Sequence, residues 1–450
     1  MNPDRIASLV EPDRVHRDAY VSETVFRLEC ERLFRRAWIY VGHDSLVPHA
    51  GDYATADVAG QPLLMVRQSD GAVAVMLNRC AHKGSPVVSG RWGHVDRVLR
   101  CPYHSWSYRL DGSLLAVPVA EGYAGTRMRE CDTGRGLSRV SSAQHRGFVF
   151  ARLAAEGIGF EEYFGEMLGC IDAIADRSPV GELQVAGPPL RSLIRCNWKI
   201  YLENIPDALH ASVTHESSVA AADAVWEQEA EARRQGREAG AGEPAAGRPT
   251  VIEQLSPFGS GSPFMEDMGG RCVPNGHVIL GVRASLHSGY SAVPAYEAAM
   301  RRAYGEERAA RILSWNPQNA LLYPSLALKA APQTVRVVRP LAVDRTVVEI
   351  WAFRAREAPA ELLERTRLYN RLVFSPMSMV AHDDVHVFEG IQRALAADAN
   401  PWVSLHRNHR AQLGGDAAEV GGLDEALMRH QFAAWARAMS PGTAGAEAAG

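Results

Sequence analysis

Two short cysteine–histidine pairs constrain the fold of this 450-residue chain more than any other feature. Cys80 and His82 lie in the sequence CAH, and Cys101 and His104 lie in CPYH. A run of residues typical of a β-strand precedes each pair, so we expect each pair in a loop that follows a strand. Two such loops can hold one metal centre between them. The sequence therefore predicts a small β domain built around a metal site.

The grouping of the four ligands distinguishes two kinds of metal centre. Two cysteines and two histidines satisfy the tetrahedral preference of zinc. A Rieske [2Fe–2S] centre needs two thiolates on one iron and two imidazoles on the other, and each loop supplies one of each. CAHKGS and CPYHSWSY closely resemble the two Rieske boxes, and neither holds the extra cysteine of respiratory-complex Rieske proteins. The resemblance is therefore to the oxygenase or ferredoxin type, with Tyr103 and Trp106 placed to shield the cluster. The residues that it assigns to the cluster are Cys80, His82, Cys101 and His104.

The remaining chain predicts an α+β protein. Short β-like runs such as YATADVA, PLLMVRQ and RGFVFARL indicate an all-β Rieske domain over residues 40–153. A helix over residues 22–36 falls in an N-terminal segment, 1–39, that we expect to pack on a catalytic domain. That catalytic domain takes up residues 154–450.

The second half alternates between helical and strand patterns. TVRVVRP and TVVEIWAFRAR, residues 334–340 and 346–356, have the period-two pattern of antiparallel strands. Helices are expected over PAELLERTRLYNRLV and from about Asp383. Residues 227–249 are predicted to form a mobile loop, although their EAEARR part is also compatible with a helix, and residues 440–450 a disordered tail.

Composition excludes several classes of function. The net charge of −4 and the lack of a long Lys/Arg run argue against a nucleic-acid partner. No stretch approaches the roughly 20 apolar residues of a membrane span, and the N-terminus has no signal-peptide pattern. Seven scattered cysteines suit a reducing compartment, so we expect a cytoplasmic protein.

A second candidate metal site lies in ENIPDALHASVTH, residues 203–215. On a regular helix Asp207 and His210 share a face, because residues three apart are neighbours. His215 follows His210 by five positions and would lie on another face, so the helix must end or distort if both bind one ion. Pro206 predicts a restart or a kink. Without other evidence the two histidines would be surface or core residues.

The pattern Asn204-x-x-Asp207-x-x-His210-x-x-x-x-His215, after NWK (197–199), resembles the mononuclear-iron motif of Rieske non-haem iron oxygenases. The resemblance covers the chain from the early helix to about residue 395. It implies a catalytic domain of the helix-grip (START-like) type, an antiparallel sheet covered by helices. It also implies that His210 and His215 bind mononuclear Fe(II), with Asn204 beside the iron.

A downstream carboxylate must complete the two-histidine, one-carboxylate triad. Asp384 matches the family's ligand, and on a helix it shares a face with Phe388 and Ile391, so we expect it to point inward. Asp383 faces a weaker apolar stripe and is the alternative ligand. If it is not the ligand, we expect it to be a helix-capping carboxylate.

Two iron sites imply electron relay from the Rieske cluster. No Gly-rich dinucleotide motif follows a predicted strand, so a separate reductase, with or without a ferredoxin, must supply electrons from NAD(P)H. By resemblance the chain forms homotrimers, or an α3β3 assembly with a small β subunit. Asp207 would then link His104 of one subunit to His210 of the next; a helix-capping role is the alternative.

The reaction implied is hydroxylation, foremost dihydroxylation, of an aromatic substrate with O2 in the breakdown of aromatic compounds. The HAS and ENxxDxxHAS patterns resemble most those of relatives that act on carboxylated rings. Candidate partners for such a carboxylate are Arg283, Arg336 and Arg339. Monohydroxylation, oxidative demethylation and a Rieske electron-transfer protein without oxygenase activity are the alternatives. Leu209 stands where relatives commonly have an aromatic residue, and few have a proline at the position of Pro206.

Overall fold

The structure, a computed structural model, describes residues 6–126, 136–236, 250–287, 293–409 and 419–440. It contains two compact units, a smaller one over Cys30–Phe160 and a larger one that combines Met1–Glu29 with Glu161–Gly450. Residues 30–39, expected in the N-terminal segment, thus belong to the smaller unit.

The smaller unit consists of antiparallel sheets. Ala59 and Gly60 join two strands through a turn in which both residues have positive φ (50° and 71°), as a two-residue type I′ hairpin requires. Its core contains Leu64, Met76 and Trp106, none more than 4% exposed. The first sheet has the order β6-β5-β4-β7, with β4 Asp52–Val58, β5 Gln61–Arg67, β6 Val73–Leu77 and β7 Trp92–His94. The second and third contain β8 Val98–Arg100, β9 Ser107–Arg109 and β10 Leu114–Ala116, and β3 Ile39–His43, β11 Ser141–His145 and β12 Phe148–Arg152.

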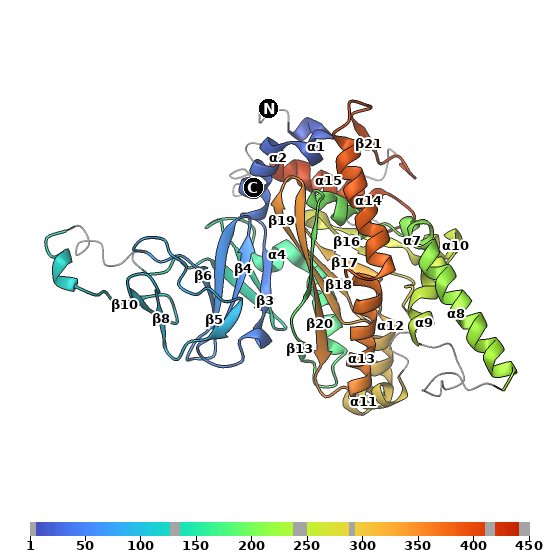
Figure 1. Ribbon diagram of the computed structural model, residues 1–450, viewed down its shortest axis with the longest axis horizontal. Helices are drawn as coiled ribbons and strands as arrows, with labels where there is room; N and C mark the ends of the chain where they lie inside the picture. The colour runs from blue at the N-terminus through green and yellow to red at the C-terminus, as the bar shows by residue number, and fades with distance from the viewer. Residues whose placement is uncertain (1–5, 127–135, 237–249, 288–292, 410–418, 441–450) are drawn as a thin grey trace. The chain divides into compact units, whose positions relative to one another are not determined.

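The larger unit is built on a nine-stranded antiparallel sheet of order β13-β20-β19-β18-β17-β16-β15-β22, with β14 also paired to β20. Figure 1 labels most of these strands. The two predicted strands form its longest pair, β19 and β20. Its strands are β13 Leu183–Val185, β14 Leu190–Ile194, β15 Gly270–Val273, β16 His277–Leu280, β17 Asn319–Leu322, β18 Leu326–Lys329, β19 Thr334–Ala342, β20 Arg345–Ala355 and β22 Glu419–Val420.

Helices cover this sheet (Figure 1), with α13 packed against β20 and α14 against β14. This arrangement confirms the expected antiparallel sheet with helices. The helices are α4 Phe160–Phe164, α5 Leu168–Asp176, α6 Trp198–Asn204, α7 Leu209–Thr214, α8 Glu216–Arg234, α9 Thr250–Leu255, α10 Ser262–Met268, α11 Pro294–Tyr304, α12 Glu306–Ser314, α13 Ala360–Tyr369, α14 Met379–Leu395 and α15 Ala426–Met439.

The loop expected over residues 227–249 does not begin until after Arg234, because α8 continues to that residue. The helical alternative for EAEARR is confirmed. Residues 237–249 lie outside the described residues, as does most of the expected tail. Among the described residues, no helix combines the length and the apolar character that crossing a bilayer requires.

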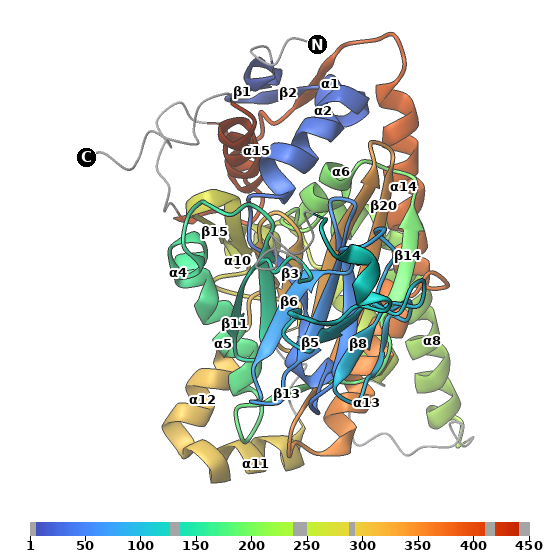
Figure 2. The same cartoon turned by 90° about the vertical axis from the view of Figure 1, so that its left-hand side faces the viewer.

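The N-terminal segment packs on the larger unit, where α1 (Asp18–Val21), α2 (Glu23–Glu29), β1 (Val10–Glu11) and β2 (Arg14–His16) lie near α15 (Figure 2). β2 also pairs with β21 (Trp402–Ser404).

A buried ion pair ties three distant segments together beside the second candidate site. Glu29, at the end of α2, is fully buried and pairs with Lys199 of α6. Its carboxylate also accepts hydrogen bonds from the indole N–H groups of Trp198 (2.9 Å) and Trp435 (2.6 Å). Asn197 starts α6, since its side chain accepts a hydrogen bond from the Lys199 N–H. The NWK sequence therefore fixes the position of α6.

Candidate metal centres

Cys80 and Cys101 each begin a tight backbone loop of the same form. In both loops the cysteine N–H donates to the carbonyl five residues on, and the N–H four residues on donates back to the cysteine carbonyl. The residue at that fourth position, Gly84 or Ser105, has a positive φ of 77° or 58°. The two loops are thus local repeats of one turn, each presenting a cysteine and a histidine.

The two thiols are buried and the two imidazoles lie nearer the surface. Cys80 and Cys101 are 3% and 2% exposed, and the Tyr108 hydroxyl lies 3.1 Å from the Cys80 sulfur. Burial alone would raise the pKa of the Cys80 thiol, but hydrogen bonds from Tyr108 and from backbone N–H groups lower that pKa below its usual value. These donors stabilise a thiolate, which is the form that binds metal.

The histidine rings of the two loops face one another. The His82 and His104 ring centroids are 4.7 Å apart, and Trp106 stacks on His82 at 4.9 Å. Trp106 therefore covers the site as expected. Tyr103 covers it less than expected, because its side chain is 64% exposed, although its ring lies 3.8 Å from that of His104. Nδ1 of His82 is buried without a hydrogen-bond partner. An unpartnered imidazole nitrogen beside two thiols fits a [2Fe–2S] cluster.

The second candidate site depends on a break in a helix. α6 ends at Asn204 and α7 begins at Leu209, with buried Pro206 between them. Because proline has no N–H, the break leaves no amide unpaired at this position. α7 then ends at Thr214, and His215 leaves the helical conformation at φ −101° and ψ 18°. The expected distortion between the two histidines is present, and it turns both towards one point.

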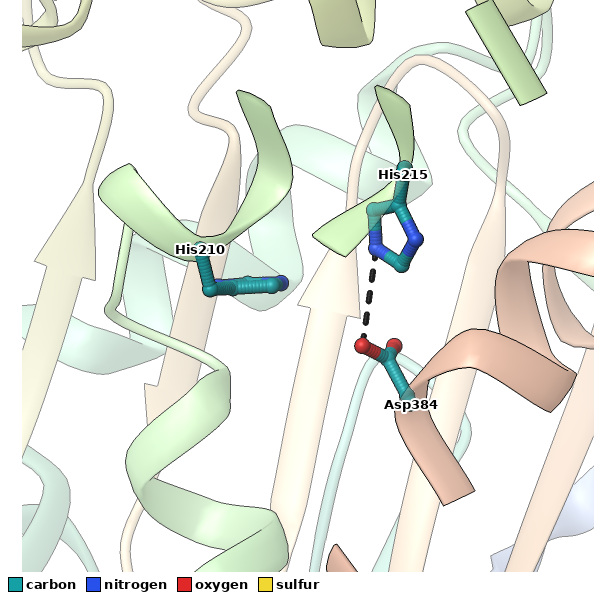
Figure 3. Close-up of side chains that lie close together, drawn as sticks. All are labelled: His210, His215 and Asp384. Atoms are coloured by element: carbon teal, nitrogen blue, oxygen red, sulfur yellow. Dashed lines mark ion pairs between the residues drawn. The ribbon is translucent and has the colours of Figure 1, made fainter. Parts of the chain in front are cut away.

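His210, His215 and Asp384 converge on a common space (Figure 3). Each offers a ligand atom, and these atoms all lie within 4.8 Å of one another. Nε2 of His215 is 3.5 Å from an oxygen of Asp384, whereas its Nδ1 faces Asp383 at 3.7 Å. Of the two aspartates, Asp384 is the one in the cluster, and Asp383 orients the histidine from behind.

The inward stripe expected for α14 is only partly present. Phe388 is buried, but Ile391 is 39% exposed. Gln392 and Glu389 instead accept hydrogen bonds from the backbone N–H groups of Asn197 and Arg195, and so connect α14 to the start of α6.

The electrostatics of this cluster favour a divalent cation. Burial lowers the pKa of both histidines, that of His215 to about 4, so the imidazoles are neutral and able to coordinate metal. Burial raises the pKa of the Asp384 carboxyl to about 7, against the opposing effects of Arg336 and Asn204. The Nδ1 atoms of His210 and His215 face the carboxylates of Asp207 and Asp383, at 4.0 and 3.7 Å. The Nε2 atoms are therefore left for a metal ion. Two neutral imidazoles and a destabilised carboxylate form the donor set of a mononuclear iron site.

Asp207 has two sets of contacts. One carboxylate oxygen accepts a hydrogen bond from the Leu209 N–H at 3.0 Å and lies 3.5 Å from Arg407. The other oxygen lies 4.0 Å from Nδ1 of His210. Asp207 therefore caps the start of α7, the alternative considered from the sequence, and at the same time faces the histidine.

A pocket opens beside the three candidate ligands. Asn204 and Asp207 also line it, and most of its wall is apolar, with Phe258, Met265, Met268, Leu280, Leu286, Val373, Phe374 and Val380. Its remaining polar wall is formed by Gln318, Asn319, Lys329 and Arg336. A mostly apolar pocket with a few polar groups is typical of a small-molecule site.

Only one of the three arginines considered from the sequence lines this pocket. Arg336 does, whereas Arg339 lies 3.3 Å from Glu349 and Arg283 is exposed. Lys329 also lines the pocket but was not predicted from the sequence. It is the only charged residue between Arg311 and Arg336, a signal that would have identified it.

The family assignment rests on both halves of the chain. A Rieske [2Fe-2S] domain model matches residues 37–127, and a model of the ring hydroxylating alpha subunit (catalytic domain) matches residues 175–441. The chain is 30% identical to the toluate 1,2-dioxygenase alpha subunit of Pseudomonas putida, covering 87% of this chain and 83% of that protein. It is 27% identical to the anthranilate 1,2-dioxygenase large subunit of Acinetobacter baylyi, covering 88% and 80%. Its fold resembles a naphthalene 1,2-dioxygenase variant with a TM-score of 0.77, at 22% identity over 98% of this chain and 95% of that one.

The chain belongs to the alpha subunits of ring-hydroxylating oxygenases, which are Rieske non-haem iron enzymes. Members of this family are oxidoreductases with a Rieske [2Fe–2S] cluster and a mononuclear iron. They are terminal oxygenases that work with a reductase or ferredoxin and are typically multimeric. The family, the fold and the two cofactors expected from the sequence are therefore confirmed.

Proposed function

We propose that this chain is the cytoplasmic terminal oxygenase of a system that hydroxylates an aromatic acid, most simply by adding both atoms of O2 to the ring. The observation that carries the proposal is the cluster of His210, His215 and Asp384 at the wall of a mostly apolar pocket. The toluate and anthranilate dioxygenase relatives support an aromatic acid as substrate.

Two separate sets of residues would hold the two metal groups. Cys80, His82, Cys101 and His104 would hold the cluster, and His210, His215 and Asp384 the mononuclear iron. When bound, the cluster supplies electrons one at a time and the iron activates dioxygen. A triad of three protein ligands leaves positions open beside the pocket, and the apolar wall excludes water and holds the ring.

Asp207 is the residue we propose for electron entry. Its free oxygen faces Nδ1 of His210, so it can hydrogen-bond to that imidazole while Arg407 and the Leu209 N–H hold the other oxygen. In a homotrimer, or an α3β3 assembly with a small β subunit, the same carboxylate would accept a hydrogen bond from His104 of a neighbouring subunit. His104 is exposed, which suits that contact.

The test is a single turnover. The purified oxygenase is reduced with dithionite, mixed with benzoate and ¹⁸O-labelled dioxygen, and its products are identified by mass spectrometry. We expect a product carrying two labelled oxygens, and about three irons per chain before reaction. A product with one labelled oxygen would assign monohydroxylation instead, and loss of a methyl group from a methoxybenzoate would assign demethylation. A fully reduced protein with about two irons and no oxygenated product would leave only an electron-transfer role.

A further inference from the structure

Three polar side chains occupy one face of the central sheet at the pocket. Arg336 on β19 pairs in register with Ala327 on β18, which in turn pairs with Leu321 on β17. Because alternate residues of a strand share a face, Asn319, Lys329 and Arg336 all lie on the side of these three residues. Lys329 and Arg336 are therefore neighbours at the pocket, although Lys329 is the last residue of β18 and Arg336 lies within β19.

Both cations are buried and their hydrogen-bonding capacity is largely unused. Lys329 and Arg336 are 5% and 4% exposed. The Lys329 ammonium donates to the carbonyl of Gln318 at 3.0 Å, its one hydrogen bond within the described ranges. Arg336 donates to the side-chain oxygen of Asn319 at 2.6 Å and also interacts with the Tyr201 hydroxyl, but its Nε is buried without a partner. Neither cation forms an ion pair with any carboxylate that the structure describes.

Such an arrangement is costly for the folded protein alone. A buried charge needs a partner of opposite sign, and two neighbouring cations repel one another. Burial and the charge of Arg336 lower the pKa of Lys329 well below its usual value. Two acidic residues line the pocket with them, Asp207 and Asp384. Arg336 lowers the pKa of Asp384, whose charge a bound iron ion would neutralise. Asp207 is already paired with Arg407.

Aromatic rings line the pocket both at these cations and at the candidate iron ligands. The Arg336 guanidinium lies 5.2 Å from the ring centre of Phe374, and the Lys329 ammonium 6.0 Å from that of Tyr369. Phe258 contacts His215 across the same pocket. These walls suit a planar ring that reaches from the cations to the histidines.

We propose that Lys329 and Arg336 bind the carboxylate of the aromatic substrate and so place its ring beside His210, His215 and Asp384. This inference rests on the proposed function and names the residues that select its substrate. The Lys329 ammonium has two N–H donors left, so it provides most of the preference for an acid over its neutral amide. Arg336 is also held by Asn319 and sets the orientation of the bound carboxylate.

The test is substrate binding without turnover. Isothermal titration calorimetry on the oxidised, iron-loaded oxygenase compares the binding of benzoate with that of benzamide, a neutral ligand of nearly the same shape. The comparison is repeated with 2- and 3-substituted benzoates and their amides. The intact protein should bind the acids about 10- to 100-fold more tightly than the amides, as expected for hydrogen bonds to a charged group. Lys329→Met should reduce this ratio to near one, and Lys329→Arg should restore most of it.

The matched control is Arg345→Met, which removes one positive charge from an exposed side chain of the same sheet. It should leave the acid-to-amide ratio unchanged. Iron content and the visible spectrum of the cluster verify that each variant is folded.

An intact protein that binds no acid of the series more tightly than its amide, or a Lys329→Met variant that keeps the preference, would overturn the inference. The two proposals fail separately. Acid-selective binding through Lys329 without any oxygenated product removes the proposed function alone. Oxygenation of aromatic acids by a protein whose acid preference does not depend on Lys329 removes this inference alone.

Discussion

Removing one partner of the buried Glu29–Lys199 pair should destabilise the larger unit strongly. Neither residue is more than 3% exposed, and the nearest alternative donors to Glu29 are the Trp198 and Trp435 indoles. Lys199→Met leaves a buried carboxylate held by two neutral donors, and Glu29→Gln leaves a buried ammonium among aromatic rings. An uncompensated buried charge costs about 3–5 kcal/mol, so each single variant should lose about 3 kcal/mol of unfolding free energy.

The double variant Glu29→Gln/Lys199→Met tests the reasoning. It removes both charges and keeps an acceptor for the two indoles, so it should cost only about 1 kcal/mol. Calorimetric unfolding of all four proteins, with mononuclear iron content as a second readout, measures the cycle. A double variant as unstable as the sum of the two single variants would show that the two charges do not compensate one another, and would refute the argument.

Three further predictions concern the site and its surroundings. Asp384→Asn should reduce iron from about three to about two per chain and leave the visible spectrum of the cluster unchanged; an unchanged iron content would remove Asp384 as a ligand. Asp207→Asn keeps an acceptor for the Leu209 N–H, so it should retain both metal centres yet lose most turnover, and normal product formation would limit Asp207 to capping α7. Burial lowers the pKa of His277 to about 4, and its neutral Nδ1 accepts the Tyr323 N–H, so its stabilisation is present above pH 6.5 and lost as pH falls towards 4. The stability cost of His277→Gln should therefore shrink between pH 6.5 and 4 in thermal unfolding, and a cost independent of pH would contradict this.

Local patterns were enough to predict the elements that carry the chemistry. The β-like runs YATADVA, PLLMVRQ and RGFVFARL predicted β4, β5 and β12 of the smaller unit, because backbone conformation there depends on neighbouring residues. The five-residue gap between His210 and His215 predicted a helix break, since a regular helix cannot turn both to one point. Errors arose where tertiary contacts decide exposure. Ile391 has the apolar spacing of a buried stripe but remains 39% exposed.

The sequence by itself determined the donor types and their spacing, and therefore the family and its two iron cofactors. Cysteine and histidine pairs in tight loops have few uses, and that chemistry is readable over a few residues. The tertiary structure decided which aspartate joins the two histidines and which cations reach the pocket. Lys329 and Arg336 become neighbours only through the register of β18 with β19, and Asp384 meets His215 only because α14 packs against α6. Strand register and helix packing join residues far apart in the chain, and no local pattern contains that information.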